Sequence, residues 1–174
     1  ILLSIFFYSW WNIYYLPVIL FSILINYYFY KKLVTIKESR KKIFWIAVTS
    51  NILILLIFKY ADFIIQNFNL LFSTDIDYLN LPFPLAISFY TFQTIAFLVN
   101  VYDEDILNVK FKEFFLFITF FPQLIAGPIV KYNNMMPQFN NDENKWFNKK
   151  NFIIGLVIIF IGLIKKIYFA GTLS

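Results

Sequence analysis

The sequence has no cysteine and no histidine among its 174 residues, and only 14% of its residues are charged. Without cysteine it can form no disulfide, thiolate metal site or thiol nucleophile. Without histidine it lacks the commonest general acid or base and the commonest metal ligand. We therefore expect no metal site, and catalysis by this chain alone would depend on Lys, Asp, Glu, Ser or Tyr.

Apolar residues take the place of the missing charge. They make up 60% of the sequence, 23% of the residues are aromatic, and the mean hydropathy is +0.68. An average globular domain is about 25% charged and about 45–50% apolar, so this chain has too little charge to cover a surface that faces water. We expect an all-α fold: a polytopic integral membrane helical bundle in which residues 1–174 form a single transmembrane domain.

The chain ends look interrupted. Ile1 is not a start methionine, and residues 1–9 are already apolar, with no basic region ahead of them as in a signal peptide. No polar tail follows the last apolar stretch. We expect the chain to be the N-terminal part of a longer membrane domain.

A basic loop at 31–42 predicts the orientation in the membrane. It joins two apolar segments and holds six basic residues against one acid, Glu38, which by the positive-inside rule indicates the cytoplasmic side. Because both flanks enter the membrane, we expect no nucleic-acid partner, whereas contact with the lipid bilayer and its anionic lipids is compatible with this loop. The basic residues are Lys31, Lys32, Lys37, Arg40, Lys41 and Lys42.

The remaining segments follow from charge and length, since a helix needs ~20 apolar residues to cross ~30 Å of hydrocarbon. The predicted order is a partial span at 1–9, an interfacial turn at 10–15, spans at 16–30, 43–58 and 81–102, a broken or re-entrant segment at 114–129, and a last segment at 152–169. The loop at 61–80 has three aspartates and no basic residue, as an external loop can have. Pro82 and Pro84 suit the first turn of the following helix, and residues 133–151 are predicted to form a polar cytoplasmic loop.

The span at 81–102 carries a polar arc. Ser88, Thr91 and Thr94 recur at three-residue intervals, with Tyr90 and Gln93 beside them. Such an arc avoids lipid. It serves either as polar glue between packed helices or as the wall of a cavity that holds water or substrate.

Two later segments are short for a membrane crossing. Residues 114–126 are uncharged, and Gly127-Pro128 then breaks any helix, so that Gln123 would point into a wet or protein-lined cavity; an ordinary short helix ending at Gly-Pro is the alternative. Residues 152–164 end at Lys165 and Lys166, which lie at an interface or in a polar funnel, or snorkel from a thin span.

Several blocks resemble one family, in the same order as in that family. The most specific is Phe121-Pro-Gln-Leu-Ile-Ala-Gly-Pro-Ile-Val-Lys-Tyr132, followed by Pro137-Gln138. It resembles the signature of the membrane-bound O-acyltransferase (MBOAT) family, in the alginate O-acetylation (AlgI-type) branch. Supporting blocks are Ile87–Tyr102, Phe7–Asn12, Lys59–Phe63 and Gly162–Lys166. Lys131 stands where the signature often has Arg, which keeps the charge but loses the bidentate fork.

The resemblance implies a ring of helices around a central funnel. Through it, an acyl group, acetyl in the first instance, would pass from a cytoplasmic thioester donor (acetyl-CoA or an acyl carrier) towards hydroxyls of an extracytoplasmic glycan. It implies no bound cofactor, a location in the bacterial cytoplasmic (inner) membrane, and a partner protein for extracytoplasmic acetyl transfer or polysaccharide modification. The family's catalytic histidine lies in a later segment, so this chain is expected to hold no catalytic residue and to be inactive alone.

The residues expected to line the funnel or substrate path are Ser88, Thr91, Gln93, Gln123, Gly127, Pro128, Lys131 and Tyr132. A transport component or a non-catalytic scaffold of a polysaccharide modification or export complex is the alternative function. The residues do not distinguish alginate from another exopolysaccharide, peptidoglycan or teichoic acid as acceptor.

Overall fold

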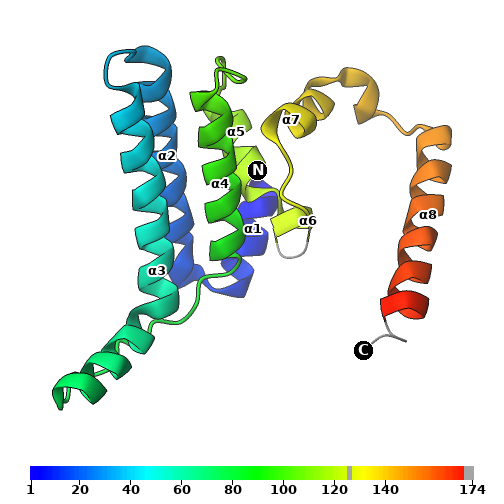
Figure 1. Cartoon of the computed structure of the whole chain (residues 1–174). Helices are drawn as coiled ribbons and strands as arrows, with labels where there is room; N and C mark the ends of the chain where they lie inside the picture. Colours follow the sequence, from blue (N-terminus) through cyan, green and yellow to red (C-terminus); the bar gives the residue numbers. More distant parts are fainter. Residues whose placement is uncertain (125–126, 171–174) are drawn as a thin grey trace. The chain divides into compact units, whose positions relative to one another are not determined.

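A computed structural model describes residues 1–124 and 127–170, and these form helices and connecting segments without a strand (Figure 1). The chain divides into two compact units, Ile1–Met135 and Met136–Ser174, which we describe separately. The α-helices are α1 (Leu2–Trp11), α2 (Leu16–Thr35), α3 (Arg40–Phe72), α4 (Ile87–Tyr102), α5 (Phe111–Thr119), α6 (Phe121–Leu124), α7 (Tyr132–Asn140) and α8 (Lys149–Ile164). This confirms the all-α class.

In the first unit α2, α3 and α4 pack side by side, with α1 and α5 against α2 (Figure 1). The helices form because their sequences are continuous apolar runs with almost no glycine, and they stay together because large side chains fill the space between them. The largest fully buried apolar side chains include those of Ile19, Ile23, Tyr30, Leu33, Ile87, Phe97, Leu98, Phe114 and Phe117.

Among the described residues, three helical segments are long and apolar enough to cross a membrane: Ile13–Thr35, Arg40–Phe72 and Lys149–Tyr168. The 33 residues of α3 reach about 50 Å at 1.5 Å per residue, more than the ~30 Å of hydrocarbon. The 16 residues of α4 reach only about 24 Å.

The helix bounds differ from the predicted spans on both sides of the basic loop. Lys31 and Lys32 belong to α2, with Lys32 in its last turn, and α3 already begins at Arg40, so the connection is only four residues long. At its other end α3 continues to Phe72, so the predicted loop at 61–80 is helical over more than half of its length. Charge marks where a chain leaves the membrane, and a helix can continue in water beyond that point.

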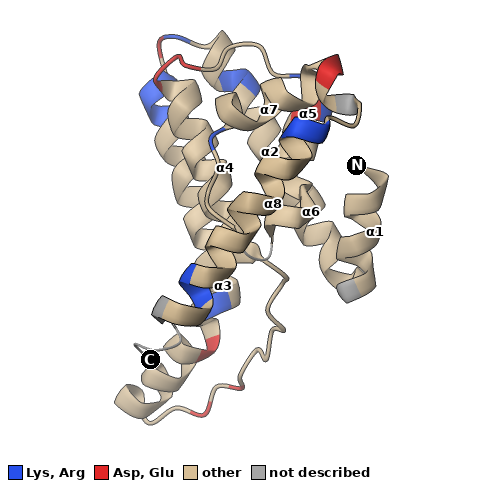
Figure 2. Ribbon diagram, turned by 90° about the vertical axis from the view of Figure 1, so that its right-hand side faces the viewer, with Lys and Arg blue, Asp and Glu red and all other residues tan. Residues whose placement is uncertain are grey.

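The predicted helix start at Pro82 and Pro84 is wrong. The chain from 74 to 84 has no regular secondary structure, and α4 begins only at Ile87. The carboxylate of Asp62 on α3 accepts hydrogen bonds from the backbone N–H groups of Leu79 (2.8 Å) and Asn80 (3.1 Å). These bonds hold the segment along α3, and Figure 2 shows acidic positions along the extended chain that follows α3.

The interfacial turn predicted at 10–15 is present with a shifted start. Helix α1 runs to Trp11, and Asn12 then adopts an extended backbone whose side-chain oxygen accepts a hydrogen bond from the Tyr14 N–H at 3.0 Å. A 3-10 turn at Ile13–Tyr15 leads into α2, which has a proline in its first turn.

The broken segment at 114–129 breaks earlier than Gly127-Pro128. Helix α5 ends at Thr119, Phe120 is extended, and α6 begins at Phe121. Pro122 gives the reason: in a continuous helix it would lack an N–H and clash with the preceding turn, whereas it fits the first turn of a new helix. Residues 125 and 126 of the predicted segment lie outside the described residues.

The predicted polar loop at 133–151 is wrong over most of its length. Helix α7 covers Tyr132–Asn140 and a 3-10 turn covers Asp142–Lys145. The many asparagines of this helix made the segment resemble a polar loop, although its apolar Met135 is buried in the first unit.

In the second unit the last segment is longer than predicted. The side-chain oxygen of Asn148 caps α8 by accepting hydrogen bonds from the N–H groups of Lys150 (3.0 Å) and Asn151 (3.2 Å). Helical structure continues past Ile164 as a π-helical turn at Lys165–Ala170. The side chains of Lys165 and Lys166 are exposed on that turn.

Candidate functional site

The polar arc of α4 is turned into the first unit. Thr91, Gln93, Thr94 and Tyr90 are each at most 2% exposed, and Ser88 is half-buried. This agrees with the expectation that the arc avoids lipid. Burial of so many polar atoms is costly in a membrane protein unless each finds a partner.

Gln93 links the arc to the break between α5 and α6. Its Nε2 donates a 2.9 Å hydrogen bond to the carbonyl oxygen of Phe117. The last four carbonyls of a helix have no partner within it, so the end of α5 at Thr119 leaves the Phe117 carbonyl available. One side of the Gln93 amide therefore acts as glue between helices.

The oxygen of the same amide has no such partner. In the described part of the chain, the Gln93 Oε1 and the hydroxyl of Tyr90 are buried polar atoms without a hydrogen-bond partner. An unpaired buried acceptor costs about 1–3 kcal/mol. Such an atom can accept a hydrogen bond from a hydroxyl or amide that reaches the interior.

Tyr132 also contacts Phe117, through its ring. Its ring is 5.4 Å from the ring of Phe117 and 5.5 Å from that of Phe97, both in edge-on arrangements. Its hydroxyl donates a 2.9 Å hydrogen bond to the carboxylate of Glu113, whose oxygen also accepts from the Lys110 N–H at 3.3 Å. The start of α7 is thus bound to the start of α5.

The environment of Tyr132 keeps its hydroxyl protonated. Burial, together with the hydrogen bond to Glu113, raises the pKa of Tyr132 above its ordinary value. Tyr132 therefore acts as a hydrogen-bond donor at neutral pH, and its hydroxyl holds the first residue of α7 to Glu113 of α5.

The other signature residues lie nearer the surface. The Gln123 Nε2 is 3.5 Å from the sulfur of Met135. A Cβ added to Gly127 would lie 3.3 Å from the Cβ and carbonyl oxygen of Gln123, so glycine permits this close approach. Gly127, Pro128 and Lys131 are exposed, and the Lys131 carbonyl accepts hydrogen bonds at the start of α7.

The structure therefore brings together only part of the predicted set. Gln93 and Tyr132 both contact Phe117, Thr91 is buried on the same helix as Gln93, and Gln123 closely approaches Gly127. The exposed Pro128 and Lys131 and the half-buried Ser88 do not join this buried cluster.

Sequence reasoning missed two contributors to this region. Glu113 was not predicted because it lies just before the uncharged segment at 114–126. An acidic residue in the first turn is nevertheless a usual sign of a helix N-terminus. The Phe117 carbonyl was missed because Pro122, which ends the helix early, was read as part of a continuous run.

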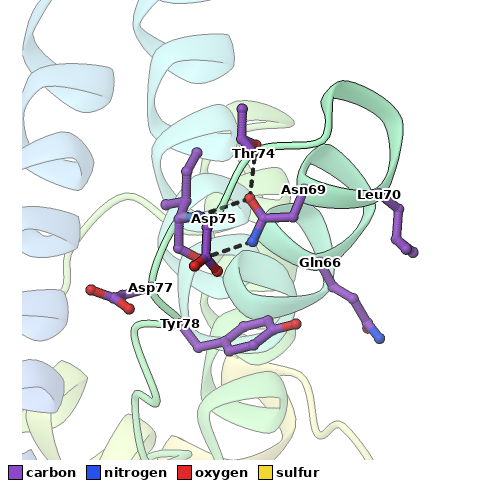
Figure 3. Close-up of a pocket in the computed structure, with 8 residues that line it drawn as sticks. Gln66, Asn69, Leu70, Thr74, Asp75, Asp77 and Tyr78 are labelled. Carbon is purple, nitrogen blue, oxygen red and sulfur yellow. Dashed lines mark hydrogen bonds between the residues drawn. The ribbon is translucent and has the colours of Figure 1, made fainter.

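A separate pocket of about 400 Å³ lies where α3 ends (Figure 3). The side chain of Asn69 builds it: Oδ1 accepts hydrogen bonds from the Thr74 hydroxyl (2.9 Å) and the Ile76 N–H (3.0 Å), and Nδ2 donates to the Ile76 carbonyl (2.9 Å). Asp75 and Asp77 also line it. None of the eight predicted lining residues is among those that line this pocket, so it is distinct from the α4–α5 cluster.

Comparison with known proteins gives a consistent set of relatives. The sequence model of MBOAT, the membrane-bound O-acyltransferase family, matches residues 5–174. The chain is 39% identical to a "Peptidoglycan O-acetyltransferase" of Helicobacter pylori, over 99% of this chain and 38% of that protein. It is 29% and 27% identical to proteins named "Probable alginate O-acetylase AlgI" of Pseudomonas putida and Pseudomonas aeruginosa, over 97% of this chain and 36% and 33% of theirs.

The chain thus spans only 33–38% of the length of these relatives. No solved structure matches it.

Proposed function

Because the chain belongs to the membrane-bound O-acyltransferase family, we propose that it forms part of a membrane enzyme that passes an acetyl group from a cytoplasmic thioester donor towards hydroxyls of a cell-envelope glycan. The observation that carries this proposal is the family match, which extends over nearly the whole chain. The names of the relatives support acetyl as the acyl group.

Peptidoglycan is the acceptor that we put first. The identity to a protein named for peptidoglycan O-acetylation is 39% over 99% of this chain. For proteins named for alginate O-acetylation it is 27–29% over 97% of this chain, or 35% over 52% of it. Alginate is the second acceptor to test.

The chemistry assigns this chain a supporting role. In acyl transfer the acceptor hydroxyl oxygen bonds to the thioester carbonyl carbon, the carbon–sulfur bond breaks, and the hydroxyl proton passes through a general base to the leaving thiolate. The chain holds no histidine for that step. Its own contribution is to line a path that excludes water and to offer a fixed acceptor, the Gln93 Oε1, to a donor group of the substrate.

The proposal includes an orientation and a partner. The chain is an integral membrane protein, and we infer that its membrane is the bacterial inner membrane, with residues 31–42 on the cytoplasmic side. A donor on one side and a glycan on the other require a partner on the outer side, and we propose an extracytoplasmic acetyl-transfer protein for that role.

The test is acyl transfer by the full-length protein in proteoliposomes, with labelled acetyl thioester on the basic-loop side and peptidoglycan or alginate fragments on the other. We expect labelled acetyl ester on the glycan when the partner is present. Gln93→Leu should lower the rate by about tenfold, which corresponds to one lost hydrogen bond. The exposed Gln66→Leu, at the end of α3, is the matched control and should keep the rate.

Absence of ester formation with every thioester would refute the enzyme proposal. Movement of solute across the same vesicles would then identify a transport component. If the protein shows neither acyl transfer nor transport, a scaffold is the remaining function.

A further inference from the structure

Two apolar grooves lie side by side near the end where α2 and α3 are joined. One, of about 290 Å³, is lined by Tyr28, Phe29, Lys32, Ile36, Ile43 and Ile46. The other, of about 410 Å³, is lined by Lys42, Trp45, Ile46, Thr49, Ser50 and Leu53. Ile46 lines both, so the grooves adjoin along one face of α3.

Each groove has a lysine at its end nearest the α2–α3 connection. The Nζ of Lys32 lies 5.5 Å from the centre of the Tyr28 ring, which holds the ammonium group beside the first groove. Lys42 occupies the corresponding place in the second groove, one helical turn before Ile46. Both lysine side chains are otherwise open to an anion, since Lys32 is half-buried and Lys42 is exposed.

The surrounding charge favours an anion. Residues 31–42 contain six basic residues and one acid, Glu38. One basic residue, Arg40, is engaged: it forms an ion pair with Glu104 and donates to the Val101 carbonyl at 2.7 Å. The five lysines of residues 31–42 therefore keep a net positive charge against Glu38.

The depth of the grooves matches a lipid. Helices α2 and α3 are both long enough to span the bilayer, so the end where they join lies at a membrane surface. Trp45, 56% exposed, is the residue type that is enriched at that level. The apolar walls of the grooves are complementary to the acyl chains of a phospholipid. The lysine ammonium groups at their ends are complementary to its phosphate.

We propose that this face binds one phospholipid with an anionic headgroup, its acyl chains in the two grooves and its phosphate between Lys32 and Lys42. A zwitterionic lipid carries its own ammonium beside the phosphate and gains less from the lysines. Each lysine near a membrane surface should raise the affinity for an anionic lipid about fivefold. The two lysines together should therefore favour the anionic lipid by about 25-fold.

The test uses full-length protein in detergent, incubated with equal amounts of phosphatidylglycerol and phosphatidylcholine, with the retained lipid measured by native mass spectrometry. We expect one phosphatidylglycerol retained in clear excess over phosphatidylcholine. The double variant Lys32→Gln/Lys42→Gln should bring the two lipids to similar retention. Lys59→Gln is the matched control, because Lys59 lies at 5.3 Å over the ring of Tyr60 farther along α3 and should leave the preference unchanged.

A second variant tests the grooves apart from the charge. Ile46→Trp fills the wall that the grooves share and should lower retention of both lipids while the lysines remain. Equal retention of both lipids by the unmodified protein, an equal loss with Lys59→Gln, or unchanged retention with Ile46→Trp would each overturn the proposal. Displacement of phosphatidylglycerol by millimolar inorganic phosphate would show a phosphate site in place of a lipid site. None of these measurements depends on acyl transfer.

Discussion

Replacing both asparagines of a buried pair should destabilise the protein about as much as replacing one, and well short of the sum of the two single losses. Asn26 of α2 and Asn51 of α3 are 0% and 3% exposed and exchange two hydrogen bonds, with Nδ2 to Oδ1 distances of 3.0 and 2.6 Å. Each Nδ2 also donates at 2.8 Å to a carbonyl of its own helix, that of Ser22 or Ala47. Asn51→Leu removes both interhelical bonds and leaves the Asn26 Oδ1 buried without its donor.

The expected loss in free energy of unfolding follows from these two hydrogen bonds. Interhelical hydrogen bonds in membrane proteins contribute about 0.6 kcal/mol on average and about 1.7 at most, and an unsatisfied buried amide costs about 1–3 kcal/mol. Asn26→Leu and Asn51→Leu should each lower the free energy of unfolding by about 2 kcal/mol. In the double variant two apolar side chains meet, so its loss should fall well below the sum, with a coupling energy of about 2 kcal/mol.

The assay is a double-mutant cycle on the free energy of unfolding of the full-length protein in lipid–detergent mixtures. Asn67→Leu is the control, because the Asn67 Nδ2 also donates to a carbonyl one turn earlier, that of Phe63 at 2.7 Å, but is exposed. It should change the free energy by less than about 0.5 kcal/mol. If the losses of the two single variants simply add in the double variant, the interhelical pair does not stabilise the contact and the reasoning is refuted.

Three further predictions concern the connections of the first unit. Tyr30→Phe should raise hydrogen exchange at the Val109 N–H about fivefold, because the Tyr30 hydroxyl accepts from that N–H at 2.8 Å and the bond contributes about 1 kcal/mol. Arg40→Gln should lower the midpoint of heat unfolding by a few degrees through loss of the partly exposed ion pair with Glu104, which contributes about 1 kcal/mol or less. Asp62→Ala should speed protease cleavage of the extended segment after α3, since its carboxylate holds that backbone, with little change in global stability.

For each of these three predictions, a substitution at a nearby residue serves as the control. Tyr27→Phe removes a 3.2 Å bond to the Val109 carbonyl and should leave exchange at the Val109 N–H nearly unchanged. Lys41→Gln removes a charge beside Arg40 without a recorded ion pair and should leave the unfolding midpoint in place. Asp77→Ala, in the same segment that Asp62 anchors, should not speed cleavage. An equal effect in any control would contradict the corresponding prediction.

The sequence alone determined the class of protein and the positions of its long apolar helices. Continuous apolar runs at 16–30 and 43–58 predict helices because helix formation and burial in lipid are local properties of such runs. The three-residue spacing of Ser88, Thr91 and Thr94 indicated a face turned away from lipid, for the same local reason. The signature at 121–132 identified the family without any reference to structure.

The tertiary structure decided which polar groups meet. Asn26 pairs with Asn51, and Gln93 meets the Phe117 carbonyl, across 25 and 24 residues of sequence. Such partners depend on the rotation and register of packed helices, which no local pattern specifies. The start of α4 was misplaced for a related reason. Hydrogen bonds to the Asp62 carboxylate hold the preceding segment along α3, and the apolar pattern at 81–86 is equally compatible with a helix.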